Sequence, residues 1–74
     1  MRILFFGRLR DGAPAGPVPP RVRDTGALRA WLGGARPELL DPAIRIAVND
    51  ELILGDRALG DDDESAFLPP MSGG

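Results

Sequence analysis

The 74-residue chain contains neither cysteine nor histidine, and this absence limits how it can fold. Disulfides, thiolate metal sites and histidine-ligated zinc are all excluded, so no covalent or metal link can hold so short a chain together. The length allows one domain, and 43% apolar with 27% charged residues is typical of a globular chain. The fold must therefore depend on packing alone, and histidine-based catalysis is excluded as well.

The apolar positions that we expect to form the core are spread over the whole chain. They alternate with polar residues in segments rich in β-branched or aromatic side chains, and they recur at helical spacing in one segment. We expect the core to comprise Ile3, Phe5, Val22, Leu28, Trp31, Leu32, Leu40, Ile44, Ile46, Val48, Leu52, Leu59 and Phe67.

One segment has the pattern of an amphipathic helix. Leu28, Trp31 and Leu32 are spaced three and four residues apart and form one apolar stripe. Asp24 and the threonine after it can cap the N-terminus. The Gly-Gly pair at 33–34 predicts the end of this helix, because glycine adopts the left-handed conformation of many helix C-termini.

Five segments have the composition of β-strands. They span residues 2–6, 21–23, 44–48, 52–54 and 65–68. Prolines at 19 and 20 limit the second segment to an edge strand. The order β-β-α-β-β-β predicts an α+β fold, a mixed sheet of about five strands with one main helix on one face and the first and last strands side by side in the middle. We expect the domain to cover residues 1–68 and residues 69–74 to form a flexible C-terminal tail.

Charge and hydropathy exclude several classes of function. Nine basic and eleven acidic residues give a net charge of −2, which argues against nucleic-acid binding. Every basic residue is an arginine, so the chain has no lysine amine for a Schiff base. The longest apolar run, Ile3 to Phe6, is too short for a membrane span or a signal sequence. We expect a cytoplasmic protein that binds neither membranes nor nucleic acid.

The first strand predicts an apolar surface opposite the helix. Side chains alternate across a strand, so if Ile3 and Phe5 face the helix, Leu4 and Phe6 face outward. The last strand adds Leu68 to the same outer face. Two interpretations remain open: ordinary surface apolarity, or a protein-binding patch, which a small chain exposes for a partner.

The C-terminal residues suggest a tail that can enter a partner. Pro69 and Pro70 favour an extended start, and Met71 and Ser72 follow. The glycines at 73–74 have no Cβ and would fit a narrow channel. From Leu68 the tail can reach about 20 Å when extended. The reactive group would be the α-carboxylate of Gly74, although a frayed tail is the alternative, because many termini are disordered.

The whole chain resembles the small, sulfur-carrying subunits of molybdopterin synthases, a family of ubiquitin-like β-grasp proteins. The resemblance lies in Ile3 to Phe6 with Arg10-Asp11 after it, in Ala47-Val48-Asn49, and in the ending from Asp63 to Gly74. The specific part is the Phe-x-Pro-Pro-x-Ser-Gly-Gly ending. The segment Gly12 to Pro20 has no counterpart.

The resemblance implies a sulfur-donor subunit that is not an enzyme alone. A ubiquitin-activating-like adenylyltransferase would use ATP and Mg²⁺ to adenylate the Gly74 carboxylate. A sulfur donor protein would then convert the adenylate to a thiocarboxylate. The large catalytic subunit of molybdopterin synthase, assembled with this chain as a heterotetramer, would direct that sulfur onto a cyclic pyranopterin precursor. The cofactors would bind the partners, and this chain would hold no cofactor or metal.

The resemblance also assigns roles to individual residues. Gly74 would carry the sulfur and Gly73 would give clearance in the partner's channel. The partner-binding residues would be Phe6, Leu4, Leu68, Pro69, Pro70, Met71 and Ser72. Leu68 stands where an aromatic residue is common. Ser65 stands where an aliphatic residue is usual, and parity directs its hydroxyl into the core, where it needs a hydrogen-bond partner or lowers stability.

Other interpretations stay open. The alternatives are a sulfur carrier for thiamin or cysteine synthesis, a ubiquitin-like modifier joined to target lysines, and an interaction domain with an inert tail. The acidic run Asp61 to Glu64 is read as a solvated turn, since consecutive carboxylates do not surround a metal ion. It can also contact the activating enzyme electrostatically. Arg8 and Arg10 are candidates for contact with a partner or a phosphate.

Overall fold

The computed structural model describes residues 1–10 and 17–70. The described residues form four strands, one α-helix and two 3₁₀ helices. In chain order these are β1 (Arg2–Phe5), η1 (Gly7–Arg10), α1 (Thr25–Ala35), η2 (Pro37–Leu40), β2 (Arg45–Val48), β3 (Glu51–Ile53) and β4 (Glu64–Leu68).

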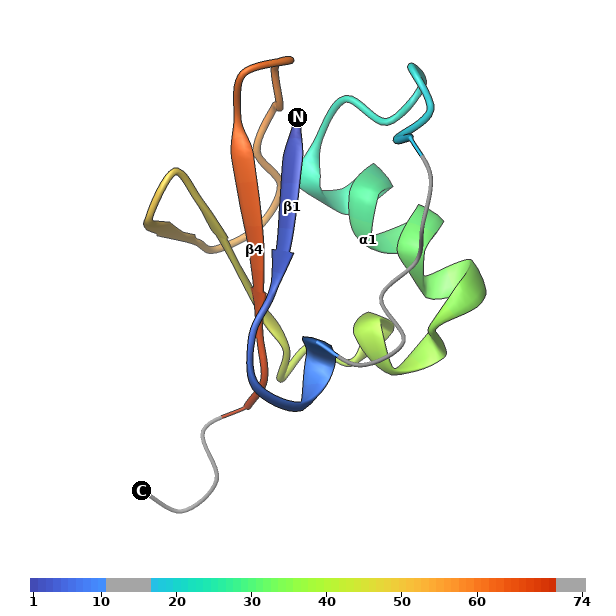
Figure 1. Cartoon of the computed structure of the whole chain (residues 1–74), viewed down its shortest axis with the longest axis vertical. Coiled ribbons are helices and arrows are strands. Elements are labelled where there is room, and N and C mark those ends of the chain that lie inside the picture. Colours follow the sequence, from blue (N-terminus) through green and yellow to red (C-terminus); the bar gives the residue numbers. More distant parts are fainter. Residues whose placement is uncertain (11–16, 71–74) are drawn as a thin grey trace.

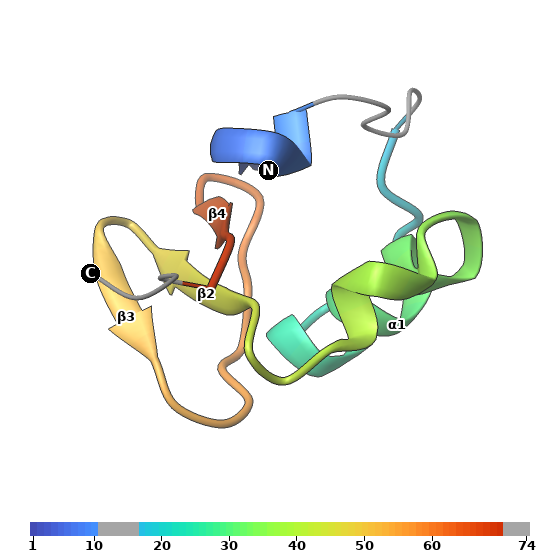
Figure 2. The same ribbon diagram turned by 90° about the horizontal axis from the view of Figure 1, so that it is seen from below.

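The strands form one mixed sheet in the order β1-β4-β2-β3. The outer strand β1 runs parallel to β4, whereas β2 is antiparallel to both β4 and β3. Helix α1 and the two 3₁₀ helices lie on the same side of the sheet or at its end, and the opposite face carries no helix of the described residues (Figures 1 and 2). The α+β prediction of one main helix on one face of a mixed sheet is confirmed.

The predicted strand at residues 21–23 does not form, so the described sheet has four strands rather than about five. The Val22 amide donates to the Pro19 carbonyl across a tight turn, which directs the Val22 side chain into the core. Only one isolated bridge, between Asp24 and Ala58, remains near this segment. As a result β4 is central, but β1 is an edge strand in the described structure, whereas both were expected in the middle.

Helix α1 begins as predicted and ends later than predicted. The Asp24 carboxylate accepts a 2.7 Å hydrogen bond from the Ala27 amide, which caps the N-terminus. The helix then continues through Gly33 to Ala35. Gly33 is buried within it because Leu40 packs on that position, where a Cβ atom would lie 2.5 Å from Leu40 Cδ2. The glycine therefore serves a close helix contact and does not end the helix.

Most of the predicted core is confirmed. Buried predicted residues are Val22, Leu28, Leu32, Ile44, Ile46, Val48 and Phe67, and partly buried ones are Ile3, Phe5, Trp31 and Leu59. Leu40 and Leu52 were wrong, being 51% and 50% exposed. Two leucines that were not expected in the core, Leu9 and Leu39, are buried instead, each on a 3₁₀ helix whose threefold spacing turns one leucine inward.

One side chain and one backbone turn further fix how the elements are joined. The Arg29 guanidinium donates to the carbonyls of Leu39, Asp41 and Ile44 at 3.2, 2.9 and 2.7 Å, and so ties α1 to the segment that leads into β2. At the β2–β3 hairpin, Asn49 and the aspartate after it have φ of 51° and 69°. These positive values are those of a type I′ turn, which sets the hairpin register.

Ser65 lies in the core, as its strand parity predicts. It is fully buried on β4 beside Ile3 and Val48 in the register of the sheet. Its hydroxyl has no hydrogen-bond partner among the described residues. An unpaired buried hydroxyl lowers the free energy of unfolding by about 1–3 kcal/mol.

We therefore expect Ser65→Ala to raise the stability of the domain. A gain of about 1 kcal/mol corresponds to a rise in Tm of about 4–8 °C for a domain of this size. Thermal unfolding followed by circular dichroism measures the change. A lower Tm in the alanine variant would show that the hydroxyl is satisfied in the folded protein.

Candidate functional site

The sheet face turned away from α1 carries a continuous apolar row. Register places Leu4 beside Ala66, Ala66 beside Ala47, and Ala47 beside Leu52, so the row crosses all four strands. The two alanines form a low centre between two leucines. Leu52 is half exposed and the other three side chains are partly buried. We call this row, together with Phe6 and Leu68, the open face.

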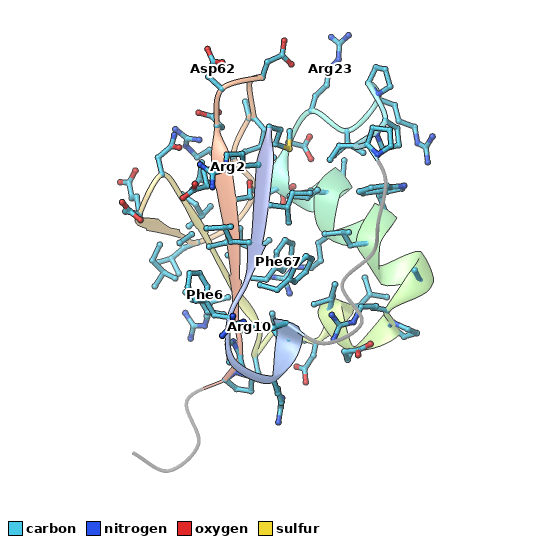
Figure 3. The ribbon with its side chains drawn as sticks, in the orientation of Figure 1. Arg2, Phe6, Arg10, Arg23, Asp62 and Phe67 are labelled. Carbon is cyan, nitrogen blue, oxygen red and sulfur yellow. The ribbon has the colours of Figure 1, made fainter. Side chains whose placement is uncertain are left out.

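Phe6 and Leu68 extend the open face towards the end of the sheet where β4 finishes. The Phe6 amide donates to the Phe67 carbonyl at 3.0 Å, which continues the parallel ladder one residue beyond β1. Figure 3 shows Phe6 on the side away from α1 and Phe67 on the side facing it. Phe6 is 44% exposed, so a large aromatic surface is available next to the last residues of β4.

A tight backbone contact fixes the point where the tail leaves the sheet. Gly7 has φ +58°, a conformation that residues with a Cβ rarely adopt. A Cβ at this position would lie 2.9 Å from Pro69 Cγ. Glycine at position 7 therefore lets Pro69 pack directly against the turn after β1. The first proline of the tail is thus held against the body of the domain.

The opposite face of the sheet supports this exit point from beneath. The rings of Phe5 and Phe67 stack with centroids 5.5 Å apart. The Arg36 guanidinium lies 5.9 Å from the Phe5 ring centroid and donates to the Leu9 carbonyl at 2.7 Å. Because Leu9 is buried, η1 is fixed at the end of the sheet beside the tail. The point where the tail leaves the sheet is therefore packed against the body of the domain.

The structure brings several predicted partner-binding residues together. Leu4, Phe6 and Leu68 share the open face, and Pro69 and Pro70 follow directly from β4. The predictions for Met71, Ser72, Gly73 and Gly74 lie outside the described residues.

Sequence reasoning overlooked Ala47 and Leu52 as members of the open face. The signal was present, because Ala47 alternates with the buried positions 46 and 48 on β2. The two-residue turn then pairs Val48 with Glu51 and Ala47 with Leu52. Leu52 was instead expected in the core.

The acidic run Asp61 to Glu64 begins in the turn before β4, and its last residue, Glu64, is the first residue of that strand. Asp63 Oδ2 accepts from the Gly60 amide and Oδ1 from Asn49 Nδ2, each at 2.8 Å. Arg57 Nη1 lies 3.6 Å from Asp63 Oδ2. Within the described ranges, 1–10 and 17–70, no group of three histidine, cysteine, aspartate or glutamate residues is arranged to hold a metal ion.

These contacts predict an acid-dependent part of the stability. The Gly60 amide, followed by the Asn49 side chain, holds the pKa of Asp63 below its usual value. A carboxyl whose pKa is lowered in the folded state stabilises above its unfolded value of about 3.9, and this stabilisation is lost as pH falls through the folded pKa. Backbone contact also lowers the pKa of Glu38, which acts in the same sense.

We expect Asp63→Asn to lower Tm at neutral pH and to flatten its decline in acid. The asparagine keeps the shape of the side chain but cannot carry the charge that the amides stabilise. Tm measured from about pH 2 to about pH 7 reports both effects. Asp62→Asn removes a charge from the exposed neighbouring position and serves as the control. Parallel curves for wild type and Asp63→Asn would contradict the assignment.

Comparison with known proteins identifies the family to which the chain belongs. A family model described as "ThiS family" matches residues 3–74. The chain is also 34% identical over 80 residues to the molybdopterin synthase sulfur carrier subunit of Escherichia coli strain K12, with 100% of this chain and 99% of that protein covered. The protein therefore belongs to the ThiS family, and its fold is the ubiquitin-like β-grasp. Within the part of the chain that the structure describes, no helix is long and apolar enough to cross a membrane.

Proposed function

We propose that this protein is a sulfur carrier for molybdopterin biosynthesis. The Gly74 carboxylate is adenylated and then converted to a thiocarboxylate, whose sulfur is delivered to a cyclic pyranopterin precursor. Similarity to the E. coli subunit across the whole chain supports this role. The structural observation that carries it is the packed tail exit, where Pro69 packs against Gly7 beside the exposed Phe6.

The chemistry explains why such a carrier needs partners. A carboxylate is a poor electrophile, so the activating enzyme supplies ATP and Mg²⁺ and joins AMP to the Gly74 carboxylate, releasing pyrophosphate. Sulfur at the sulfide level, supplied by the sulfur donor protein, then displaces AMP and forms the thiocarboxylate. Because this chain has no cysteine, histidine or lysine, the groups that catalyse both steps belong to the partners. The carrier itself contributes the carboxylate, the glycines at 73–74 that fit a narrow channel, and the docking surface.

The open face is the proposed docking surface for the large catalytic subunit, with which the chain forms a heterotetramer. Interfaces are built around a buried apolar centre with aromatic anchors. The two alanines provide a shallow centre, and Phe6 provides an aromatic anchor beside the tail. Docking there orients the tail towards the partner while leaving it free to extend. We place this cycle in the cytoplasm.

Intact-mass measurement of the protein purified from its own host tests the carrier role. Replacement of one oxygen by sulfur at Gly74 is the expected result. An unmodified carboxylate, even after incubation with the activating enzyme, ATP and a sulfur donor, would overturn the proposal. A branched adduct between Gly74 and a lysine of another protein would instead identify a modifier.

Removal of the gene tests the pathway. We expect the host to lose molybdopterin and the activities that depend on it, and the wild-type gene to restore both. A requirement for thiamin or cysteine with molybdopterin unchanged would assign the carrier to one of those pathways.

A further inference from the structure

Three exposed arginines surround the exit of the tail. Arg45 on β2 pairs in register with Leu68, the last residue of β4. Arg8 and Arg10 lie on η1, which packs against the ends of β1 and β4. Figure 3 shows Arg10 and Phe6 towards the end of the molecule where β4 finishes, and Asp62 at the opposite end. We call Arg8, Arg10 and Arg45 the tail collar.

The tail collar has no visible role in holding the fold together. Arg29 and Arg36 each bind backbone carbonyls, and Arg57 bonds to Asp63. The collar side chains, in contrast, form no hydrogen bond or ion pair with any described residue. Three arginines without a polar contact to a described residue thus gather at one end of a chain whose net charge is −2.

The surface around the point where the tail leaves the sheet has the composition of a protein–protein interface. Phe6 and Leu68 supply an apolar centre, and charged side chains surround it. Arg8 shares a surface hollow with Glu38 and Asp41, and Arg45 shares another with Arg29 and Asp56. Such rim charges govern how fast partners meet more than how tightly they bind.

The distance to the reacting atoms excludes a direct part in the chemistry. Gly74 is the sixth residue after Leu68, and an extended chain of that length spans about 20 Å. With the tail inserted, the phosphates of the activated nucleotide lie at its tip and the collar stays outside. The collar therefore meets the rim of the partner's channel.

We propose that the tail collar docks on an acidic protein surface, namely aspartate and glutamate side chains around the entrance through which the activating enzyme admits the tail. The inference rests on the proposed function. The carrier must enter and leave that enzyme once for every sulfur atom it receives. Charge-guided encounter suits this cycle because it speeds association without requiring a long-lived complex.

The structure offers a pair of charge-matched variants for the test. Arg10→Gln/Arg45→Gln removes two charges from the collar. Arg21→Gln/Arg23→Gln removes the same charge from two exposed arginines away from the tail exit; Arg23 is labelled at the opposite end in Figure 3. Neither collar arginine makes a polar contact with a described residue. Among the described residues, the control variant loses one exposed hydrogen bond, from Arg23 Nε to the Pro20 carbonyl at 3.4 Å, so both variants should fold. Stopped-flow mixing with the activating enzyme of the same host gives the association rate constant at several salt concentrations.

We expect the collar variant to associate about tenfold more slowly at low salt and to lose most of the salt dependence. The control variant should keep the wild-type rate and slope. Equal rates and slopes for both variants would overturn the collar inference.

A second readout, adenylation at a saturating concentration of the carrier, separates the collar inference from the proposed function. If the wild type is adenylated and the collar variant associates as fast as the wild type, the collar inference alone is refuted. If the wild type is never adenylated, the proposed function is refuted, and the collar inference with it.

Discussion

Adding a single lysine after Gly74 is expected to abolish thiocarboxylate formation while leaving the fold intact. The proposed reaction takes place at the α-carboxylate of Gly74, and an added residue converts that carboxylate into an unreactive amide. The new carboxylate belongs to a bulky residue that the narrow channel proposed for the tail would exclude. Incubation with the activating enzyme, ATP and a sulfur donor, followed by intact-mass measurement, should show no sulfur incorporation.

The extended chain carries its own control. A carboxypeptidase specific for basic residues removes the added lysine, and sulfur incorporation should then return to the wild-type level. Circular dichroism of the extended chain should show the wild-type Tm, because the change lies beyond the described domain. Sulfur incorporation by the uncleaved extended chain would contradict the assignment of Gly74 as the reactive residue.

The parts of the fold that the sequence predicted are those set by local rules. Asp24 caps α1 because an aspartate side chain reaches the amides of the first turn whatever surrounds it. The alternation on β2 buries Ile46 and Val48, and the turn after it sets the hairpin register. These features depend on a few neighbouring residues, so pattern alone was sufficient to predict them.

The errors arose where a single contact, rather than the periodic pattern of apolar residues, decides the structure. Gly33 stays helical because Leu40 needs the space that a larger side chain would occupy. The segment at 21–23 forms no strand because a turn stabilised by the Pro19 carbonyl directs Val22 into the core. Neither contact leaves a periodic trace in the sequence.

The candidate site divides in the same way. Strand parity was enough to place Leu4, Phe6 and Leu68 on one face. The resemblance of the last residues to the Phe-x-Pro-Pro-x-Ser-Gly-Gly ending of a known family predicted that the tail is functional. The packing of Pro69 on Gly7 could not be foreseen, because it depends on how two segments far apart in the sequence meet. The same holds for the position of Arg45 beside Leu68, which requires the β2–β4 register.

Phe6→Asp is expected to weaken binding to the large catalytic subunit by at least about 30-fold, which corresponds to about 2 kcal/mol. Phe6 is the exposed aromatic side chain of the open face, and its removal takes away the anchor of the proposed interface. A carboxylate in its place must also be desolvated on docking. Isothermal titration calorimetry with the purified large subunit measures the change.

Leu54→Asp provides a matched control for this experiment. Leu54 is more exposed than Phe6, at 81% against 44%, and it lines the hollow between β3 and α1 rather than the open face. Both variants exchange an exposed apolar side chain for the same charge, so a general effect of charge or solubility should appear in both. If Leu54→Asp weakens binding as strongly as Phe6→Asp, the docking surface is not the open face. If only Phe6→Asp weakens binding and its Tm stays near that of the wild type, the loss is one of recognition, because the domain that presents the tail remains folded.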